Sequence, residues 1–253
     1  MNRTMGHDVI PGEKHFRWQG GEVTRMEGFT DAIFAFAVTL LVVSLEVPKT
    51  YSELMTAMKG FAAFAICFAL LAQVWVYQYL FSRRYGLHTS YTMFLNFALV
   101  FVVLFYVYPL KFIFSLIIGQ MFNASYVTRG GEEIIQASQV PALMVIYSLG
   151  FSAVFLVFAL EYFYAYRKRE ALNLNEYEIL RTRHALWDHV FMAVLGVTVA
   201  ALARLLPVRM AGSSGFLYFL IGVYHTITGT IFGNQQRSAL ERLQAKDDHV
   251  TNV

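Results

Sequence analysis

Six long apolar stretches divide this chain, and they restrict its fold more than any other feature of the sequence. They lie at residues 26–45, 58–81, 91–118, 142–166, 186–206 and 215–232. Each has roughly the 20 residues that a helix needs to cross about 30 Å of hydrocarbon. Hydrophobic residues make up 57% of the chain and charged residues only 15%, whereas soluble domains carry about 25% charged residues. We therefore predict an all-α integral membrane protein with six transmembrane helices.

The basic residues predict how these helices are oriented. Of the 20 Lys and Arg residues, 14 fall on the side that holds both termini, and such residues accumulate on the cytoplasmic side of membranes. We expect a multi-pass protein of the cell membrane with both termini in the cytoplasm. Residues 1–23 are then a cytoplasmic N-terminal segment, residues 24–233 the transmembrane domain and residues 234–253 a cytoplasmic tail.

The remaining polar residues do not indicate an enzyme, a metal site or a nucleic-acid partner. The basic residues are spread over short loops and form no patch that could bind nucleic acid. Cys67, the single cysteine, lies in an apolar run without metal-ligand spacing, so we expect no metal and no cofactor. His184 and His225 are far apart in sequence and are assigned to hydrogen bonds within the bundle, without a carboxylate partner. Glu161 and Asp188 are expected to be solvated at helix ends.

The first apolar stretch carries the most specific pattern. At 100° per residue, Phe36, Leu40 and Val43 fall on one stripe, with Thr39 at its edge. Asp31 lies about 140° away from that stripe and cannot line the same surface. A carboxylate inside a spanning helix is costly and faces protein partners. We therefore expect Asp31 to accept hydrogen bonds from neighbouring helices or to pair with Arg25.

Residues 25–31 read Arg-x-x-x-Phe-Thr-Asp and are followed by Thr39-Leu-Leu and by Pro48. This pattern resembles the Arg-x-x-x-Phe-Ser-Asp signature in the first helix of the transmembrane protein 175 family, the potassium channels of endosomes and lysosomes and their bacterial relatives. Asn96, followed by an aliphatic run that ends at Pro109, resembles the third helix of that family. The chain length and six spans fit the bacterial form.

The resemblance implies a homotetramer in which the first helix of each subunit lines a central pore. It places the pore constriction on apolar side chains, at Phe36, Leu40 and Val43, and a polar layer of the pore at Thr39. It also assigns a network that holds the pore helices to the motif residues, which are Arg25, Phe29, Thr30 and Asp31.

The chain departs from the family pattern at three places. Thr30 replaces a serine, which keeps the hydroxyl group, and Phe36 replaces an aliphatic residue at the constriction. The second span lacks the adjacent histidines that many relatives carry, and we expect Gln78 or Tyr77 to supply the hydrogen-bond donor for Asp31.

These observations favour a potassium-permeable cation channel with an apolar constriction instead of a carbonyl selectivity filter. The expected partners are other copies of the chain, membrane lipid, and potassium and other monovalent cations. One alternative is a small secondary transporter or proton-coupled permease in which Asp31 and His225 couple ions to transport. Another is a non-conducting assembly or lipid-interaction protein. The first stretch contains no proline, whereas transporters often break such helices.

Overall fold

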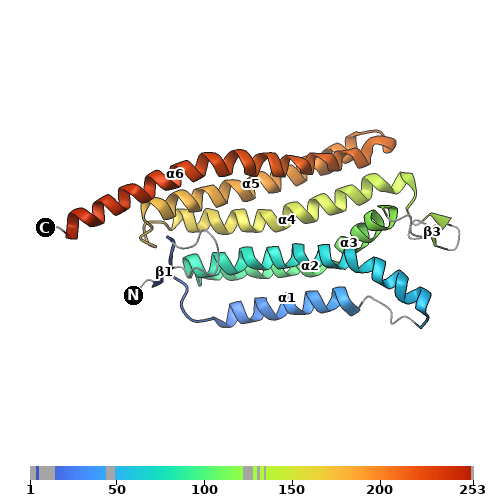
Figure 1. The fold of residues 1–253 in the computed structure, drawn as a ribbon, viewed down its shortest axis with the longest axis horizontal. Helices are drawn as coiled ribbons and strands as arrows, with labels where there is room; N and C mark the ends of the chain where they lie inside the picture. Colours follow the sequence, from blue (N-terminus) through green and yellow to red (C-terminus); the bar gives the residue numbers. More distant parts are fainter. Residues whose placement is uncertain are drawn as a thin grey trace.

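The computed structural model of the chain is a bundle of six long helices (Figure 1). It describes residues 4–5, 15–43, 49–121, 128–129, 132–133 and 135–251. The helices are α1 (Arg25–Val43), α2 (Tyr51–Tyr85), α3 (Ser90–Met121), α4 (Val140–Arg167), α5 (Glu176–Leu205) and α6 (Leu220–Thr251). Two short 3₁₀ segments, η1 (Ala137–Gln139) and η2 (Val208–Phe219), precede α4 and α6. Strands β1 (Thr4–Met5) and β2 (Arg17–Trp18) pair antiparallel, as do β3 (Thr128–Arg129) and β4 (Glu132–Glu133).

The first five predicted spans match helices, whereas the sixth differs. The chain runs as 3₁₀ helix through residues 208–219 and becomes α-helical only at Leu220. Helix α6 then continues to Thr251, so the predicted boundary at residue 233 falls inside a continuous helix.

Within the described residues, five helical segments are long and apolar enough to cross a membrane. They are Gly60–Tyr85, Ser90–Gly119, Ala137–Arg167, Glu176–Leu205 and Val208–Arg242. Helix α1 is not among them, and its first seven residues include Arg25, Glu27 and Asp31. The bundle is therefore an all-helical membrane fold whose first helix is distinctly more polar at one end.

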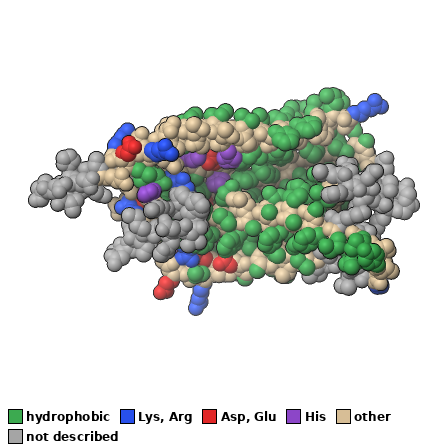
Figure 2. Space-filling view, viewed as in Figure 1, with side chains coloured by type: hydrophobic (Ala, Val, Ile, Leu, Met, Phe, Trp, Pro, Cys, Tyr) green, Lys and Arg blue, Asp and Glu red, His purple; other side chains and the backbone are tan. Residues whose placement is uncertain are grey.

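Helix α1 lies at one edge of the bundle and α6 at the opposite edge (Figure 1). Helix α1 packs against α2 and α3, and α4 packs most extensively against α5. One core cluster joins α1 to α2, α3 and α4 through residues such as Phe34, Leu41, Leu99 and Phe158. The surface is apolar over the length of the helices, and charged side chains gather toward the ends (Figure 2).

The start of α1, the end of α2 and the start of α3 lie at the same end of the bundle, which we call the terminal end because α6 also finishes there (Figure 1). Strand β2 is fixed at this end by Arg17, which forms an ion pair of 2.6 Å with Glu178 at the start of α5. The carboxylate of Glu178 raises the pKa of the Arg17 guanidinium, chiefly by accepting its hydrogen bonds.

Candidate functional site

Helix α1 begins with a reciprocal cap. The Thr24 side-chain oxygen accepts a hydrogen bond of 3.2 Å from the Glu27 amide, and the Glu27 carboxylate accepts one of 2.8 Å from the Thr24 amide. Such a cap satisfies two backbone donors at a helix start, and the carboxylate also suits the positive end of the helix dipole. The motif residues 25–31 therefore fall in the first two turns of α1.

One face of α1 is buried against α2 and α3. Its residues are Thr30, Phe34, Ala37 and Leu41, each at most 4% exposed. Their spacing of four, three and four residues is that of a single helical face. Because this face takes up the packing surface of α1, the residues on the other side of the helix are left uncovered.

The predicted pore stripe lies largely on this uncovered side. Phe36 is 54% exposed and Thr39 is also exposed. Leu40 differs because it is half-buried and packs partly against the core cluster. The side chain of Val43 lies outside the described residues. Phe36 and Thr39 are thus the two predicted pore residues that this structure leaves free to face another molecule.

The hydroxyl of Thr39 donates a hydrogen bond of 2.6 Å to the backbone carbonyl of Phe36. A hydroxyl has one proton to donate and two lone pairs that accept. Since the proton is used within the helix, the exposed oxygen presents its lone pairs outward. This arrangement suits a cation or the hydrogen atoms of a water molecule.

The motif residues are held by partners on α2 and α3. Asp31 accepts a hydrogen bond of 2.7 Å from the indole nitrogen of Trp75. Phe29 packs edge-on against Phe97, with 5.7 Å between the ring centroids. Arg25 is exposed and makes no ion pair among the described residues, so the structure brings Asp31 to α2 and not to Arg25.

The expectation that Gln78 or Tyr77 serves Asp31 is wrong. The donor is Trp75, 44 residues from Asp31 in sequence. Gln78 instead donates to the side chain of Asn96 on α3, and both side chains are buried. Residue spacing could not single out Trp75, because the side of α2 that faces α1 is decided by packing.

Two acidic residues were assigned to the wrong environment. Glu161 is fully buried in α4, and Asp188 lies 3.4 Å from the Nε2 atom of His184 one turn earlier on α5. His225 on α6 interacts electrostatically with this pair. Histidine and acidic side chains appear together on the surface in Figure 2. The four-residue spacing of His184 and Asp188 was the available signal.

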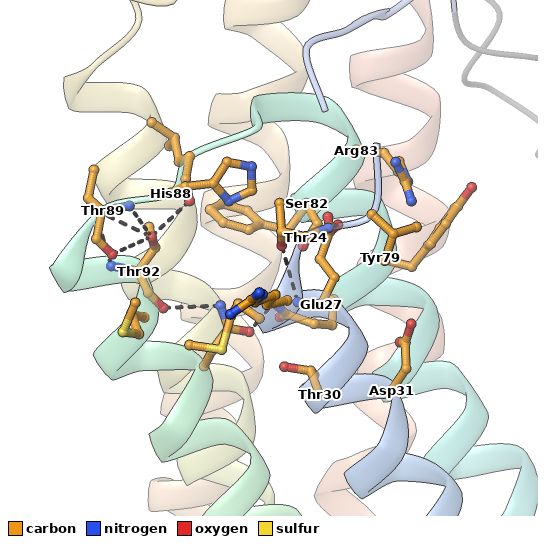
Figure 3. Close-up of a pocket in the computed structure, with 18 of the residues that line it drawn as sticks. Thr24, Glu27, Thr30, Asp31, Tyr79, Ser82, Arg83, His88, Thr89 and Thr92 are labelled. Carbon is orange, nitrogen blue, oxygen red and sulfur yellow. Dashed lines mark hydrogen bonds between the residues drawn. The ribbon is translucent and has the colours of Figure 1, made fainter. Parts of the chain in front are cut away.

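Among the described residues, no group of three or more His, Cys, Asp or Glu side chains could hold a metal ion. A cavity of about 550 Å³ does open beside the motif, between the starts of α1 and α3 and the end of α2 (Figure 3).

Comparisons with known proteins agree with the motif. Residues 25–106 match the model of the family described as endosomal/lysosomal potassium channel TMEM175. A potassium channel of Marivirga tractuosa is 37% identical over 247 aligned positions, and the alignment covers 94% of this chain and 99% of the relative. The fold also matches a crystal structure of the potassium channel MtTMEM175, solved as a threonine-to-alanine variant in complex with a nanobody–MBP fusion. The TM-score is 0.76 and the sequence identity 37%, and the match covers 89% of this chain and 99% of that chain.

These similarities confirm the fold class and the expectation that the chain is not an enzyme, since the family and both relatives are potassium channels. With a relative of 37% identity matched over almost its whole length, the chain belongs to the TMEM175 family.

Proposed function

We propose that this protein is a potassium-permeable cation channel in which four copies of the chain place α1 around a central pore. Membership in a family of potassium channels supports the activity. The observation that carries the assembly is the position of α1, which lies at the edge of the subunit with Phe36 54% exposed (Figure 1). Copies of α1 facing one another would bury this stripe.

In this assembly the side chains of Phe36 form the narrowest ring, followed by Leu40 and Val43. A ring of apolar side chains excludes water and stops ions by dewetting, so conduction requires a wider and hydrated state. Leu40 contacts the core cluster as well as the stripe, so its position couples the pore lining to the packing of the subunit.

Thr39 supplies the polar layer of the proposed pore. Its oxygen lies one turn from Phe36 and offers lone pairs, because its proton is donated to the Phe36 carbonyl. Four such oxygens would replace part of the hydration shell of a cation and give nothing comparable to an anion. This arrangement favours cations, with weaker discrimination between them than a ring of backbone carbonyls.

The motif residues fix α1 in place rather than line the pore. Trp75 holds Asp31, α3 contacts Phe29, and Thr30 lies on the buried face. We place the channel in the cell membrane with both termini in the cytoplasm, where Arg25 faces the lipid headgroups. No cofactor is part of this proposal.

Recordings of purified protein in a planar bilayer, with potassium on one side and sodium on the other, test the function. We expect discrete openings and a reversal potential displaced toward the potassium equilibrium value. Phe36→Ala should raise the conductance severalfold, because it shortens the ring that closes the pore. Phe101→Ala is the control, since Phe101 is an exposed phenylalanine on α3. Unchanged currents in a well-folded Phe36→Ala protein contradict the constriction.

The transporter alternative makes the opposite prediction, which is saturable solute or proton flux in liposomes without discrete openings. It assigns the coupling of ions to transport to Asp31 and His225. These residues lie on α1 and α6, at opposite edges of the subunit (Figure 1). Their separation favours the channel.

A further inference from the structure

Two cavities meet beside the motif. The first, of about 550 Å³, is lined by the start of α1, the end of α2 and the start of α3 (Figure 3). The second, of about 370 Å³, follows α1 and α2 from Asp31 to Val38 and from Trp75 back to Phe68. Both are lined by Asp31 and Trp75. Asp31 and Trp75, which are hydrogen-bonded to each other, therefore form a wall that the two cavities share.

The two cavities differ sharply in chemistry. The first lies at the terminal end of the bundle and contains several hydroxyl groups together with Arg25, Arg83 and His88. The second runs toward the middle of the bundle and, beyond the shared Asp31 and Trp75, is lined by apolar side chains only: Phe34, Ala35, Val38, Phe68, Leu71 and Ala72. A polar chamber next to an apolar groove along the helices matches the two parts of an amphipathic lipid, which are a polar headgroup and an acyl chain.

Two arginines and two carboxylates line the polar chamber, so the partners of each group, and not the net charge, decide what the chamber can bind. The carboxylate of Glu27 is hydrogen-bonded to the Thr24 amide, and that of Asp31 to Trp75. Arg83 donates a hydrogen bond to the backbone carbonyl of Gly21 and lies over the Tyr79 ring, 5.5 Å from the ring centroid. Arg25, in contrast, is exposed and has no ion pair among the described residues, so its guanidinium is available to an anionic ligand.

A buried hydroxyl in the same chamber also lacks a partner. Thr30 is 3% exposed, and its oxygen has no hydrogen-bond partner within the described part of the chain. In Figure 3 the Thr30 hydroxyl points into the space between α1 and α3. A buried polar group without a partner is destabilising, so a polar ligand there gains a hydrogen bond that the protein alone does not supply.

We propose that the two cavities together form a binding site for a membrane glycerophospholipid. Its phosphate group is held at the mouth of the polar chamber by Arg25, with Arg83 and His88 beside it. Thr30 binds an oxygen of the headgroup region. One acyl chain lies in the groove between α1 and α2, against Phe68 and Ala72. The lipid thereby covers a face of α1 that no helix of the subunit fills.

Lipid retention in native mass spectrometry tests this site, with 1-palmitoyl-2-oleoyl-phosphatidylglycerol as the probe. Ala72→Phe fills the groove, and Ala69→Phe is its matched control because Ala69 is exposed on the same helix but does not line the groove. We expect one lipid per protomer in the unsubstituted protein and in Ala69→Phe, and a fall of at least about tenfold in Ala72→Phe. Equal retention in all three proteins, or equal loss in both variants, overturns the proposal.

Two further measurements separate the possible occupants. Excess inorganic phosphate should leave the lipid in place, because phosphate cannot occupy the apolar groove. Displacement of the lipid by phosphate would show that only the chamber binds.

Photo-crosslinking of the unsubstituted protein with a diazirine-labelled acyl chain should label α2 between Phe68 and Trp75. Label found exclusively elsewhere would mean that another subunit or nothing fills the groove, and the proposal fails. Neither measurement depends on ion current, so its outcome is separate from that of the channel recordings.

Discussion

Replacing Glu178 by glutamine should destabilise the protein more than any neighbouring change at the start of α5. The carboxylate is fully buried and accepts three hydrogen bonds from Arg17: 3.0 Å from the backbone amide, 2.8 Å from Nε and 2.6 Å from Nη2. It also accepts one of 2.8 Å from the Asn175 amide, as half of the cap of α5. Glutamine keeps one acceptor oxygen, loses the charge and turns an amide group toward donors.

The size of the effect follows from these contacts. Removing one partner of a buried ion pair costs about 3–5 kcal/mol. The Arg17 side chain is 30% exposed, so part of its charge can be rehydrated, and we expect about 2–4 kcal/mol. For a protein of this size each kcal/mol moves the thermal midpoint by about 2–4 °C, which gives a decrease of roughly 5–15 °C. Thermal unfolding in detergent, followed by size-exclusion chromatography, measures it.

Glu176→Gln is the matched control, because it is the same change two residues earlier on the same helix. Its partner Arg242 lies at 3.0 Å, but the two side chains are 69% and 53% exposed, so little change is expected. A thermal midpoint of Glu178→Gln equal to that of Glu176→Gln would refute the reasoning.

The pH dependence follows from the same ion pair. Because Glu178 raises the pKa of Arg17, the stabilisation by this pair is present at pH values below the ordinary pKa range of arginine and is lost only above it. The difference between the two variants should therefore stay constant from about pH 7 to about pH 10.

Three other changes test the remaining contacts. Thr39→Val keeps the shape of the side chain but removes the exposed oxygen. It should lower the preference for potassium over sodium in reversal-potential measurements while leaving the assembly intact. An unchanged preference would argue against a polar pore layer at Thr39. Trp75→Phe removes the hydrogen-bond donor to Asp31 and should lower the free energy of unfolding by about 1 kcal/mol. The thermal midpoint should then fall by about 2–4 °C. Full stability would mean that water replaces the indole without loss. Gly196→Ala would place a methyl group 2.7 Å from the Ser148 carbonyl of α4 and should lower the free energy of unfolding by about 1–3 kcal/mol. Gly229→Ala, its control, has open space around the new methyl group and should be neutral or slightly stabilising. Equal thermal midpoints for the two variants would contradict the close approach of α4 and α5.

The sequence by itself predicted the helices and a stripe of residues along one face of α1. Runs of about 20 apolar residues predict spanning helices because the length of a helix and the thickness of a bilayer are fixed quantities. The stripe through Phe36 and Thr39 follows from 3.6 residues per turn, which is a local property of the chain. The motif at residues 25–31 then identified the family. The sixth predicted span, residues 215–232, lies inside the apolar segment Val208–Arg242, but its first five residues adopt 3₁₀ helix, which apolar composition does not distinguish from α-helix.

Only the tertiary structure decided which side chains meet across helices. Asp31 contacts Trp75 and not Gln78 or Arg25, and Arg17 contacts Glu178 across 161 residues of sequence. Helical periodicity gives the face of one helix but not the rotation of its neighbour, so such pairs cannot be derived from spacing. The burial of Glu161 and the two adjacent cavities depend in the same way on how α1, α2, α3 and α4 pack. The sequence determines where each helix lies and which residues share one of its faces, whereas the contacts between helices depend on how whole helices pack.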